Sequence, residues 1–356
     1  MHISNYQMIM KKIVPLSLLL LCCFACKKVN TSATQKAVTL QSKASFPFGA
    51  AIAPKLLQEN PKYKTILDQE FNSITAENMM KMRFLQPKQG QFNYENADVI
   101  VNYALQNKKR VHGHTLLWHE SVPDWVKSFQ GDSLAWDNLL KTHILTVVNR
   151  YKGKVAGWDV VNEAFNDDGS ERESIWSKNL GKDYIARAFL YARQADPKAI
   201  LFYNDYGQEY ASKKLEAILN MVADFKKRGI PIDGLGLQMH TNTKASEDGI
   251  LKAINFSAKT GLKIHISELD IQLNPDKENI TIPTAAMLEK QKAMFKMIVR
   301  TYNALPKTQK YGITQWNVGD ADTWVRSYMK RHEFPLPFDD NYQKKPAYQG
   351  ILEGLE

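Results

Sequence analysis

The chain has 356 residues, of which 44% are hydrophobic, and it carries a formal net charge of +10. This apolar content is enough for a large core and excludes a wholly disordered chain. The Lys and Arg residues are scattered rather than interleaved with aromatic residues on a helix, so we predict a basic surface and no nucleic-acid partner. All three cysteines lie within the first 26 residues. The rest of the sequence therefore offers neither a disulfide framework nor a thiolate metal site.

The first predicted elements are an export signal and a tether. A mostly apolar run at 13–25 is too short to span a bilayer but is typical of a signal peptide. It ends at Cys26 and resembles a bacterial lipoprotein signal, in which cleavage exposes a cysteine that is lipidated. We therefore predict a signal peptide at 1–26, lipidation of Cys26 and a polar tether at 27–45. The protein would then be exported and anchored to a bacterial membrane, facing the periplasm or the cell surface. The alternative is ordinary cleavage near Ala25 and secretion without a lipid.

From residue 46 onward, short apolar or β-branched runs alternate with longer stretches of helical periodicity. The eight predicted strands span 46–52, 73–78, 110–118, 157–163, 201–206, 234–240, 263–270 and 311–318. The predicted helices between them span 97–107, 134–150, 184–195, 214–228, 250–260 and 285–305. Strands that alternate with helices form parallel βαβ units, and eight such units close into a barrel. The pattern predicts an α/β fold, a single (β/α)8 TIM barrel domain over 46–356.

Polar and aromatic residues follow the predicted strands, at the barrel end where active sites of this fold lie. Glu163 and Glu268 end the fourth and seventh strands, which lie on opposite sides of an eight-stranded barrel. Glycosidic cleavage needs one carboxylic acid to protonate the leaving oxygen and a second carboxylate as nucleophile or base. The pair therefore predicts a glycosidase. Its stereochemistry stays open, because retention needs a carboxyl separation of about 5–5.5 Å and inversion about 6.5–9.5 Å.

The residues around this pair suit a sugar ligand. Trp118, Trp316 and Trp324 offer faces for stacking on pyranose rings, although aromatic residues at strand ends also serve packing. Polar side chains that can bond sugar hydroxyls are Asn78, Lys81, Asn162, Gln238 and His240. Asp159 lies four residues before Glu163, deeper on the same strand face, and is interpreted as a structural carboxylate of the barrel interior.

At these positions the sequence resembles the glycoside hydrolase family 10 endo-β-1,4-xylanases, over nearly all of 46–352. The resemblance rests on seven segments in order: FNSITAENMMK (71–81), GHTLLWH (113–119), WDVVNEAF (158–165), LFYNDY (201–206), DGLGLQMH (233–240), ISELD (266–270) and PLPFDDNYQKKPAY (335–348). It implies retaining hydrolysis of internal β-1,4-xylosidic bonds by double displacement, with Glu163 as acid/base and Glu268 as nucleophile. It further implies xylan and xylo-oligosaccharides as substrates and no requirement for a cofactor or metal; we expect a monomer.

The resemblance also assigns the neighbouring residues. The sugar-binding residues it implies are Glu77, Asn78, Lys81, His114, Trp118, Asn162, Gln238, His240, Trp316 and Trp324, with Asp270, Asn204 and Tyr206 in support. Asp270 would orient His240, and Gln238 and His240 would contact the nucleophile region. We expect hydrogen bonds from His240 and Asn162 to hold Glu268 ionised.

The sequence departs from the family pattern at 120–121, Gly207 and Asn317, which puts chain length and side-group preference in doubt but not the reaction. Three alternatives stay open. His112 and His114 could belong to a metal-dependent barrel hydrolase, although the further ligands of such a site are not evident. A sugar-binding protein without turnover would keep the same cleft. A β-1,4-glucanase would differ only in having room for the C6 hydroxymethyl group.

Overall fold

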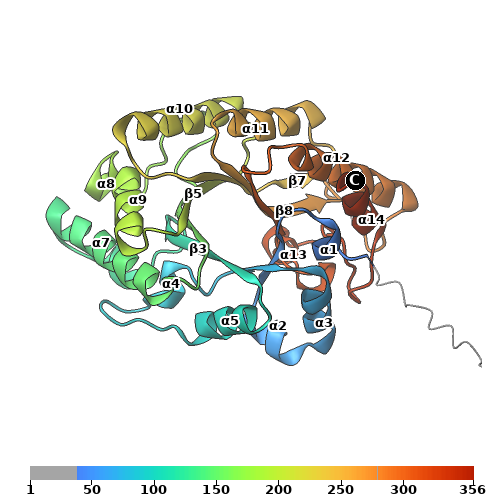
Figure 1. Ribbon diagram of the computed structural model, residues 1–356, viewed down its shortest axis with the longest axis horizontal. Coiled ribbons are helices and arrows are strands. Elements are labelled where there is room, and N and C mark those ends of the chain that lie inside the picture. Colours follow the sequence, from blue (N-terminus) through green and yellow to red (C-terminus); the bar gives the residue numbers. More distant parts are fainter. Residues whose placement is uncertain (1–37, 279) are drawn as a thin grey trace, which may run out of the picture. The chain divides into compact units, whose positions relative to one another are not determined.

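The computed structural model describes residues 38–278 and 280–356. The predicted signal peptide, Cys26 and most of the predicted tether lie outside these residues. Within the described chain, eight parallel strands close a barrel, and helices surround it (Figure 1). The barrel strands are β1 (Phe48–Ile52), β2 (Ser73–Ala76), β3 (Arg110–Trp118), β4 (Gly157–Asn162), β5 (Ile200–Asp205), β6 (Gly234–Leu237), β8 (Lys263–Gln272) and β9 (Lys310–Gln315). Pairing of β1 with β9 and of β6 with β8 closes the sheet, so the predicted TIM barrel is confirmed.

One predicted strand is divided in two. The sequence pattern gave a single strand over 234–240, but β6 ends at Leu237 and a short strand β7 (His240–Asn242) follows. Met239 lies between them with a φ of 61°, the left-handed conformation, which interrupts an extended strand. β7 pairs in parallel with Asp270–Gln272 of β8, beyond the barrel rim. The division thus places His240 beside Asp270 above the sheet.

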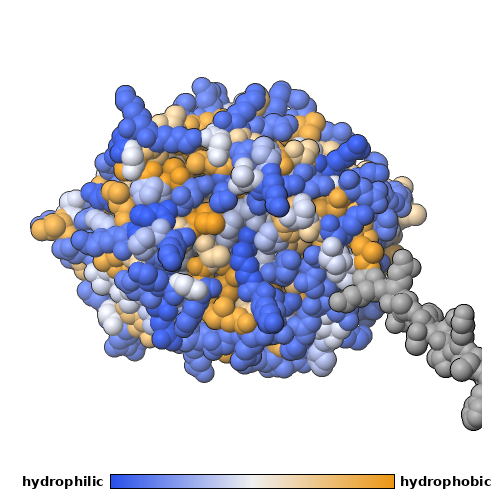
Figure 2. Space-filling model, in the orientation of Figure 1, coloured by the Kyte–Doolittle hydropathy of each residue, from blue (hydrophilic) through white to orange (hydrophobic). Residues whose placement is uncertain are grey.

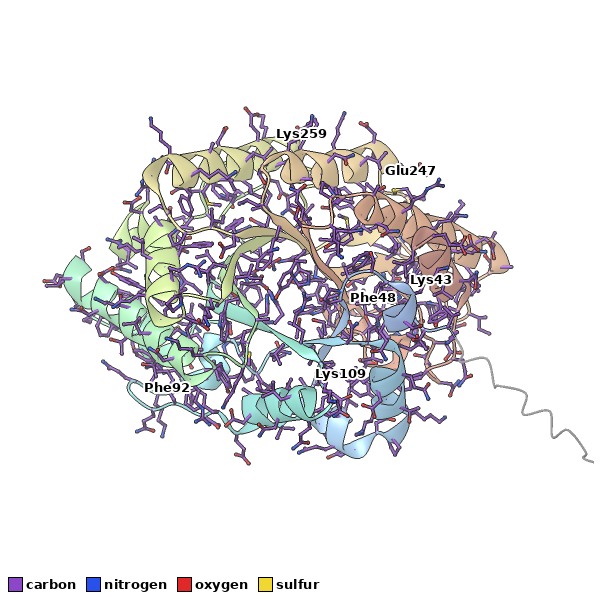
Figure 3. All side chains as sticks on the ribbon, in the orientation of Figure 1. Lys43, Phe48, Phe92, Lys109, Glu247 and Lys259 are labelled. Atoms are coloured by element: carbon purple, nitrogen blue, oxygen red, sulfur yellow. The ribbon has the colours of Figure 1, made fainter. Side chains whose placement is uncertain are left out.

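The helices of the described chain pack outside the barrel. They are α1 (Leu40–Lys43), α2 (Pro54–Glu59), α3 (Pro61–Glu70), α4 (Met82–Leu85), α5 (Glu95–Gln106), α6 (Asp124–Lys127), α7 (Ser133–Arg150), α8 (Ile175–Leu180), α9 (Tyr184–Ala195), α10 (Ser212–Arg228), α11 (Glu247–Lys259), α12 (Ala285–Asn303), the 3-10 helix η1 (Asp320–Asp322), α13 (Trp324–Met329) and α14 (Pro346–Gly354). Several of these helices have a capping side chain at the N-terminus and suitably charged residues at their ends. In α11, for example, Ser246 caps the first turn, and Glu247 and Lys259 lie at opposite ends, matching the helix dipole (Figure 3).

The beginning of the folded body corrects one boundary. The predicted tether at 27–45 extends too far, because α1 packs against α3 and α14 and Leu40 is fully buried. The carboxylate of Glu70 accepts hydrogen bonds of 2.9 Å from the Leu40 backbone N–H and the Tyr348 hydroxyl. The segment from Val38 is thereby tied to α3 and α14. The sequence of 38–45 is polar and aperiodic because Leu40 is the one buried residue in this segment.

The barrel core depends on close packing between strands. A side chain at Gly113 would put its Cβ 2.1 Å from the ring of Trp158, so only glycine fits there. On the face seen in Figure 2, hydrophilic groups predominate and apolar groups lie among them. Across residues 38–278 and 280–356, no helix combines the length and apolar character needed to cross a bilayer.

Candidate active site

Three residues that follow barrel strands adopt the left-handed conformation without being glycine. They are Glu163 after β4 (φ 58°), Met239 after β6 (φ 61°) and Asn317 after β9 (φ 79°). This conformation is uncommon for residues with a Cβ and costs about 1 kcal/mol or more. Its occurrence at three strand ends of one barrel mouth marks this rim as the functional end of the fold.

Glu163 is 9% exposed, and its carboxylate accepts three hydrogen bonds. Oε1 accepts from Nδ2 of Asn162 at 3.0 Å and from Nε2 of Gln238 at 2.9 Å. Oε2 accepts from the indole N–H of Trp118 at 2.9 Å. The carboxyl group is thus held in one orientation by residues from three different strand ends.

Glu268, on β8, is 4% exposed and has a different set of partners. Oε1 accepts from Nδ2 of Asn204 at 2.8 Å, and Oε2 lies 3.2 Å from Nε2 of His240. Burial opposes ionisation, but the hydrogen bond from His240 and the charges of His114, His240 and Lys81 outweigh it and hold the pKa of Glu268 below its usual value. A carboxylate kept ionised in a buried site is what a nucleophile requires.

A short chain of side-chain amides links the two glutamates. Nδ2 of Asn204 donates to Glu268 and also to Oδ1 of Asn162, at 2.8 Å, and Asn162 in turn donates to Glu163. The expectation that Asn162 holds Glu268 is therefore wrong, because Asn204 reaches Glu268 first and Asn162 turns toward its chain neighbour. Gln238 contacts both glutamates. Its backbone carbonyl accepts from the Glu268 N–H at 3.0 Å, while its side chain donates to Glu163.

His240 lies between two carboxylates. Its Nδ1 lies 2.8 Å from Oδ2 of Asp270, opposite the nitrogen that contacts Glu268. Burial alone would lower the pKa of His240, but Asp270 and Glu268 raise it to about 10, so the ring carries a positive charge at neutral pH. Trp324 donates its indole N–H to the same Asp270 oxygen at 2.8 Å and packs its ring 4.8 Å from that of His240. Asp270 therefore orients both rings.

The residues expected to bind sugar from β2 and β3 meet on the other side of Glu268. Lys81, 8% exposed, donates to Oδ1 of Asn78 at 3.0 Å, and its Nζ lies 4.8 Å from the ring centre of Trp118 and 5.8 Å from that of Trp316. Burial lowers the pKa of Lys81, and nearby glutamates oppose this effect, led by Glu268.

Glu77 and His114 complete this side. Burial raises the pKa of Glu77, while the charge of Lys81 opposes the rise. His114 packs against Trp316 at 5.2 Å, and its Nδ1 lies 2.9 Å from Asp159 and 4.0 Å from Glu268. Asp159 also lies 3.0 Å from Nε2 of His112, so it is a buried partner of two histidines, as its interpretation as an interior carboxylate predicted.

Tyr206 is placed by residues that the sequence reasoning missed. Arg172, from the loop before α8, donates to the Tyr206 hydroxyl at 3.0 Å and to the backbone carbonyl of Glu163 at 3.0 Å. The fully buried Lys214 lies 3.6 Å from the centre of the Tyr206 ring and 2.9 Å from the buried carboxylate of Asp205. The length of that loop was the only available signal for Arg172. No sequence signal indicated Lys214, since a lysine in a helix is normally expected to be exposed to solvent.

No cluster of three or more His, Cys, Asp or Glu side chains within the described chain is arranged to hold a metal ion. His112 and His114, the candidate metal pair, instead share the carboxylate of Asp159. Two buried glutamates at the mouth of a (β/α)8 barrel, surrounded by tryptophans and amides, define the class: a glycoside hydrolase. The family described as "Glycosyl hydrolase family 10" matches residues 37–354. The chain belongs to this family.

Individual relatives agree with the family. The chain is 39% identical to the endo-1,4-beta-xylanase of Geobacillus stearothermophilus, over 86% of this chain and 95% of that protein. It is 38% identical to endo-1,4-beta-xylanase A of Thermoanaerobacterium saccharolyticum over 87% of this chain, but spans only 27% of that longer protein. Among solved structures, xylanase 10B from Thermotoga petrophila RKU-1 in complex with xylobiose matches with a TM-score of 0.84 and 35% identity, covering 90% of this chain and 98% of that one.

Proposed function

We propose that the protein is an endo-1,4-β-xylanase that hydrolyses internal β-1,4-xylosidic bonds of xylan and xylo-oligosaccharides with retention of configuration. The observation that carries the proposal is the pair Glu163 and Glu268, linked through Asn162 and Asn204 at the barrel mouth. The names of its family 10 relatives, and the xylobiose bound to one of them, support the choice of substrate.

The proposed mechanism assigns one role to each glutamate. The ionised Glu268 attacks the anomeric carbon while Glu163 donates its proton to the glycosidic oxygen, so the bond breaks and the sugar chain leaves as an alcohol. This forms a covalent glycosyl ester on Glu268. Glu163, now ionised, takes a proton from water, and the resulting hydroxide displaces Glu268 from the anomeric carbon. The charged His240 favours the carboxylate form of Glu268 at the start and end of the cycle.

Product analysis tests substrate and stereochemistry together. We expect short oligosaccharides from arabinoxylan, little product from carboxymethyl cellulose, and a β-anomer released first in proton NMR. An α-anomer first would contradict retention, and preferential cleavage of carboxymethyl cellulose would favour the β-1,4-glucanase alternative. Glu268→Gln should abolish hydrolysis of xylan, whereas Glu278→Gln, on a surface loop, should not. Near-normal hydrolysis by Glu268→Gln would rule out its role.

We also propose that residues 1–26 direct export, that Cys26 carries the lipid and that the exported chain is a monomer. The apolar run at 13–25 followed by a cysteine supports the first two points. In a bacterial host, wild type and Cys22→Ser should fractionate with membranes, and Cys26→Ser should not. Mature protein that begins after Ala25 and lacks an acyl group would show ordinary secretion instead. The proposed monomer is tested by light scattering on the Cys26→Ser protein, which should give the mass of a single chain.

A further inference from the structure

The main chain at Glu163 forms a turn that is held by side chains from other segments. Glu163 follows the last residue of β4 and has a φ of 58°. Its backbone N–H donates to the carbonyl of Asn204 at 2.9 Å, and the next N–H, of Ala164, donates to the Tyr203 hydroxyl at 2.9 Å. Its carbonyl accepts from Nε of Arg172 at 3.0 Å. The left-handed conformation is thus fixed by hydrogen bonds on both sides of the Cα that carries the carboxyl group.

Arg172 reaches this turn because the chain folds back on itself between the two residues. The carbonyl of Ala164 accepts from the backbone N–H of Arg172 at 2.7 Å, and Phe165 pairs with Glu171 in an antiparallel bridge. The guanidinium also donates through Nη2 to the carbonyl of Phe165 at 3.2 Å. Its planar fork of N–H groups holds two carbonyls of one turn in a geometry that an ammonium group does not reproduce.

The same guanidinium joins the turn to the end of the neighbouring strand β5. Nη2 of Arg172 donates to the Tyr206 hydroxyl at 3.0 Å, and the ring of Tyr206 lies over the ammonium of Lys214. Lys214 is fully buried and pairs with the buried Asp205. Arg172 therefore ties the turn to a group that is fixed within the body of the barrel.

Different groups hold the carboxylate and the main chain of Glu163. Trp118, Asn162 and Gln238 fix how the carboxylate is turned. Arg172 fixes the main-chain position from which the side chain extends. Both matter for a proton donor, because a displacement of about 1 Å from the productive position can cost about 100-fold in rate.

We propose that Arg172 is a positioning residue for proton transfer, which holds the main chain of Glu163 so that its carboxyl group reaches the leaving oxygen and then the attacking water. The inference rests on the proposed function, in which Glu163 is the acid/base. Arg172 acts on both half-reactions through Glu163. Its loss should therefore slow each step only as far as that step needs proton transfer.

Aryl β-xylobiosides with different leaving groups test this role. In Arg172→Met, kcat/KM for phenyl β-xylobioside should fall about 30-fold, because phenoxide leaves poorly without a proton. With 2,4-dinitrophenyl β-xylobioside, kcat/KM should change by less than about twofold, because this phenol needs no proton to leave. On that substrate kcat and KM should fall together, since water attacks the glycosyl ester without a well-placed base. Equal losses of kcat/KM on the two substrates would overturn the inference.

A double substitution shows whether Arg172 acts through Glu163. In a Glu163→Ala protein, adding Arg172→Met should lower kcat/KM for phenyl β-xylobioside by less than about twofold, because the group that Arg172 positions is already gone. A second loss as large as the first would mean that Arg172 acts independently of the acid/base, which would also overturn the inference.

Two further variants separate geometry from charge and from general damage. Arg172→Lys keeps the charge but not the fork, so it should keep the same difference between the two substrates. Wild-type activity in Arg172→Lys would show that the charge alone is sufficient and would contradict the proposed role. Lys178→Met is the matched control, because Lys178 is an exposed cation on the nearby α8. It should leave kcat/KM unchanged on both substrates.

The burst of dinitrophenol counts the folded active sites, so every rate is expressed per site and a partly unfolded sample does not imitate the effect. If Arg172→Met yields no folded protein, Arg172→Lys carries the same comparison. A wild type that cleaves aryl β-cellobiosides but not aryl β-xylobiosides would overturn the proposed substrate instead. The same leaving-group series, made as cellobiosides, would then test Arg172.

Discussion

Nδ1 of His240 lies 2.8 Å from Oδ2 of Asp270, a carboxylate with no exposed surface. The contact matters because the opposite ring nitrogen faces Glu268, so the charge on His240 depends on one carboxylate and acts on the other. This arrangement makes Asp270 the group that decides whether the ring is charged at the pH of catalysis.

Replacing Asp270 by asparagine should remove most of the electrostatic stabilisation of the protonated His240 ring. The ring of His240 is charged below a pKa of about 10 in the wild type, and in Asp270→Asn its deprotonation should move down by about 1–3 pH units. Histidine 15N NMR as a function of pH measures the midpoint directly. Asp168→Asn, an exposed carboxylate, is the control and should not alter it. An equal midpoint in Asp270→Asn would show that Glu268 alone sustains the charge.

Removing the proton donor should affect substrates according to their leaving group. Glu163→Ala should lose about 10²–10⁴-fold in kcat on xylan, whose leaving oxygen needs a proton. Aryl xylobiosides with acidic phenols need no such help for glycosylation, so their first step should be nearly unchanged. Steady-state and burst kinetics on both substrates test this, with the exposed Glu171→Ala as control. Equal losses on the two substrates would argue against an acid role for Glu163.

The buried ion pair between Lys214 and Asp205, next to Tyr206, should make Lys214 important for stability. Lys214→Met leaves Asp205 buried without its ammonium partner, which should cost about 3–5 kcal/mol in the free energy of unfolding. Burial already raises the pKa of Asp205 to about 6, and losing Lys214 raises it further. Because the folded state then binds the proton more tightly than the unfolded state, the deficit should grow as the pH rises.

Denaturant titrations between pH 5 and 8 measure that deficit. Lys213→Met is the matched control, since Lys213 is the exposed neighbour on the same helix. The control should unfold as the wild type does at every pH. A Lys214→Met protein whose stability rose with pH would mean that Asp205 is not the group left uncompensated.

The segment before β1 should contribute to the stability of the barrel. Glu70→Ala removes the acceptor for Leu40 and Tyr348 and the partner of Lys344, 2.9 Å away, so the melting temperature should fall by about 5 °C or more. Calorimetry compares it with Glu59→Ala, an exposed glutamate at the end of α2. An unchanged melting temperature would mean that residues 38–45 act as a tether after all.

Most of the barrel could be predicted because its strands are short apolar runs and their order implies the topology. α9 was predicted at its observed bounds, since its apolar residues recur with helical spacing over the whole element. α2 and α14 were missed. Such short helices have weak periodicity and depend on packing against the rest of the chain.

The site was predicted as a set of residues but not as a network. Strand ends indicate which side chains reach the mouth, and these residues do gather around Glu163 and Glu268. They do not indicate which neighbour an amide selects, which is why the partner of Asn162 was wrong. Asn204 was expected only in support, yet it contacts Glu268 directly. Asn317 entered only as a departure from the family pattern, because no local pattern encodes the left-handed conformation that it adopts.

The chain of side-chain amides between the two glutamates fixes the orientation of their carboxyl groups but cannot transfer a proton between them. Asn162 and Asn204 do not titrate in water, and neither can accept a proton from one carboxyl and pass it to the other. Trp118 and Gln238, which also contact Glu163, are equally unable to relay one. Each proton that Glu163 gives to a leaving oxygen must therefore be recovered from the water that ends the same turnover. The supply of water to the open side of the cleft thus links the two halves of the cycle.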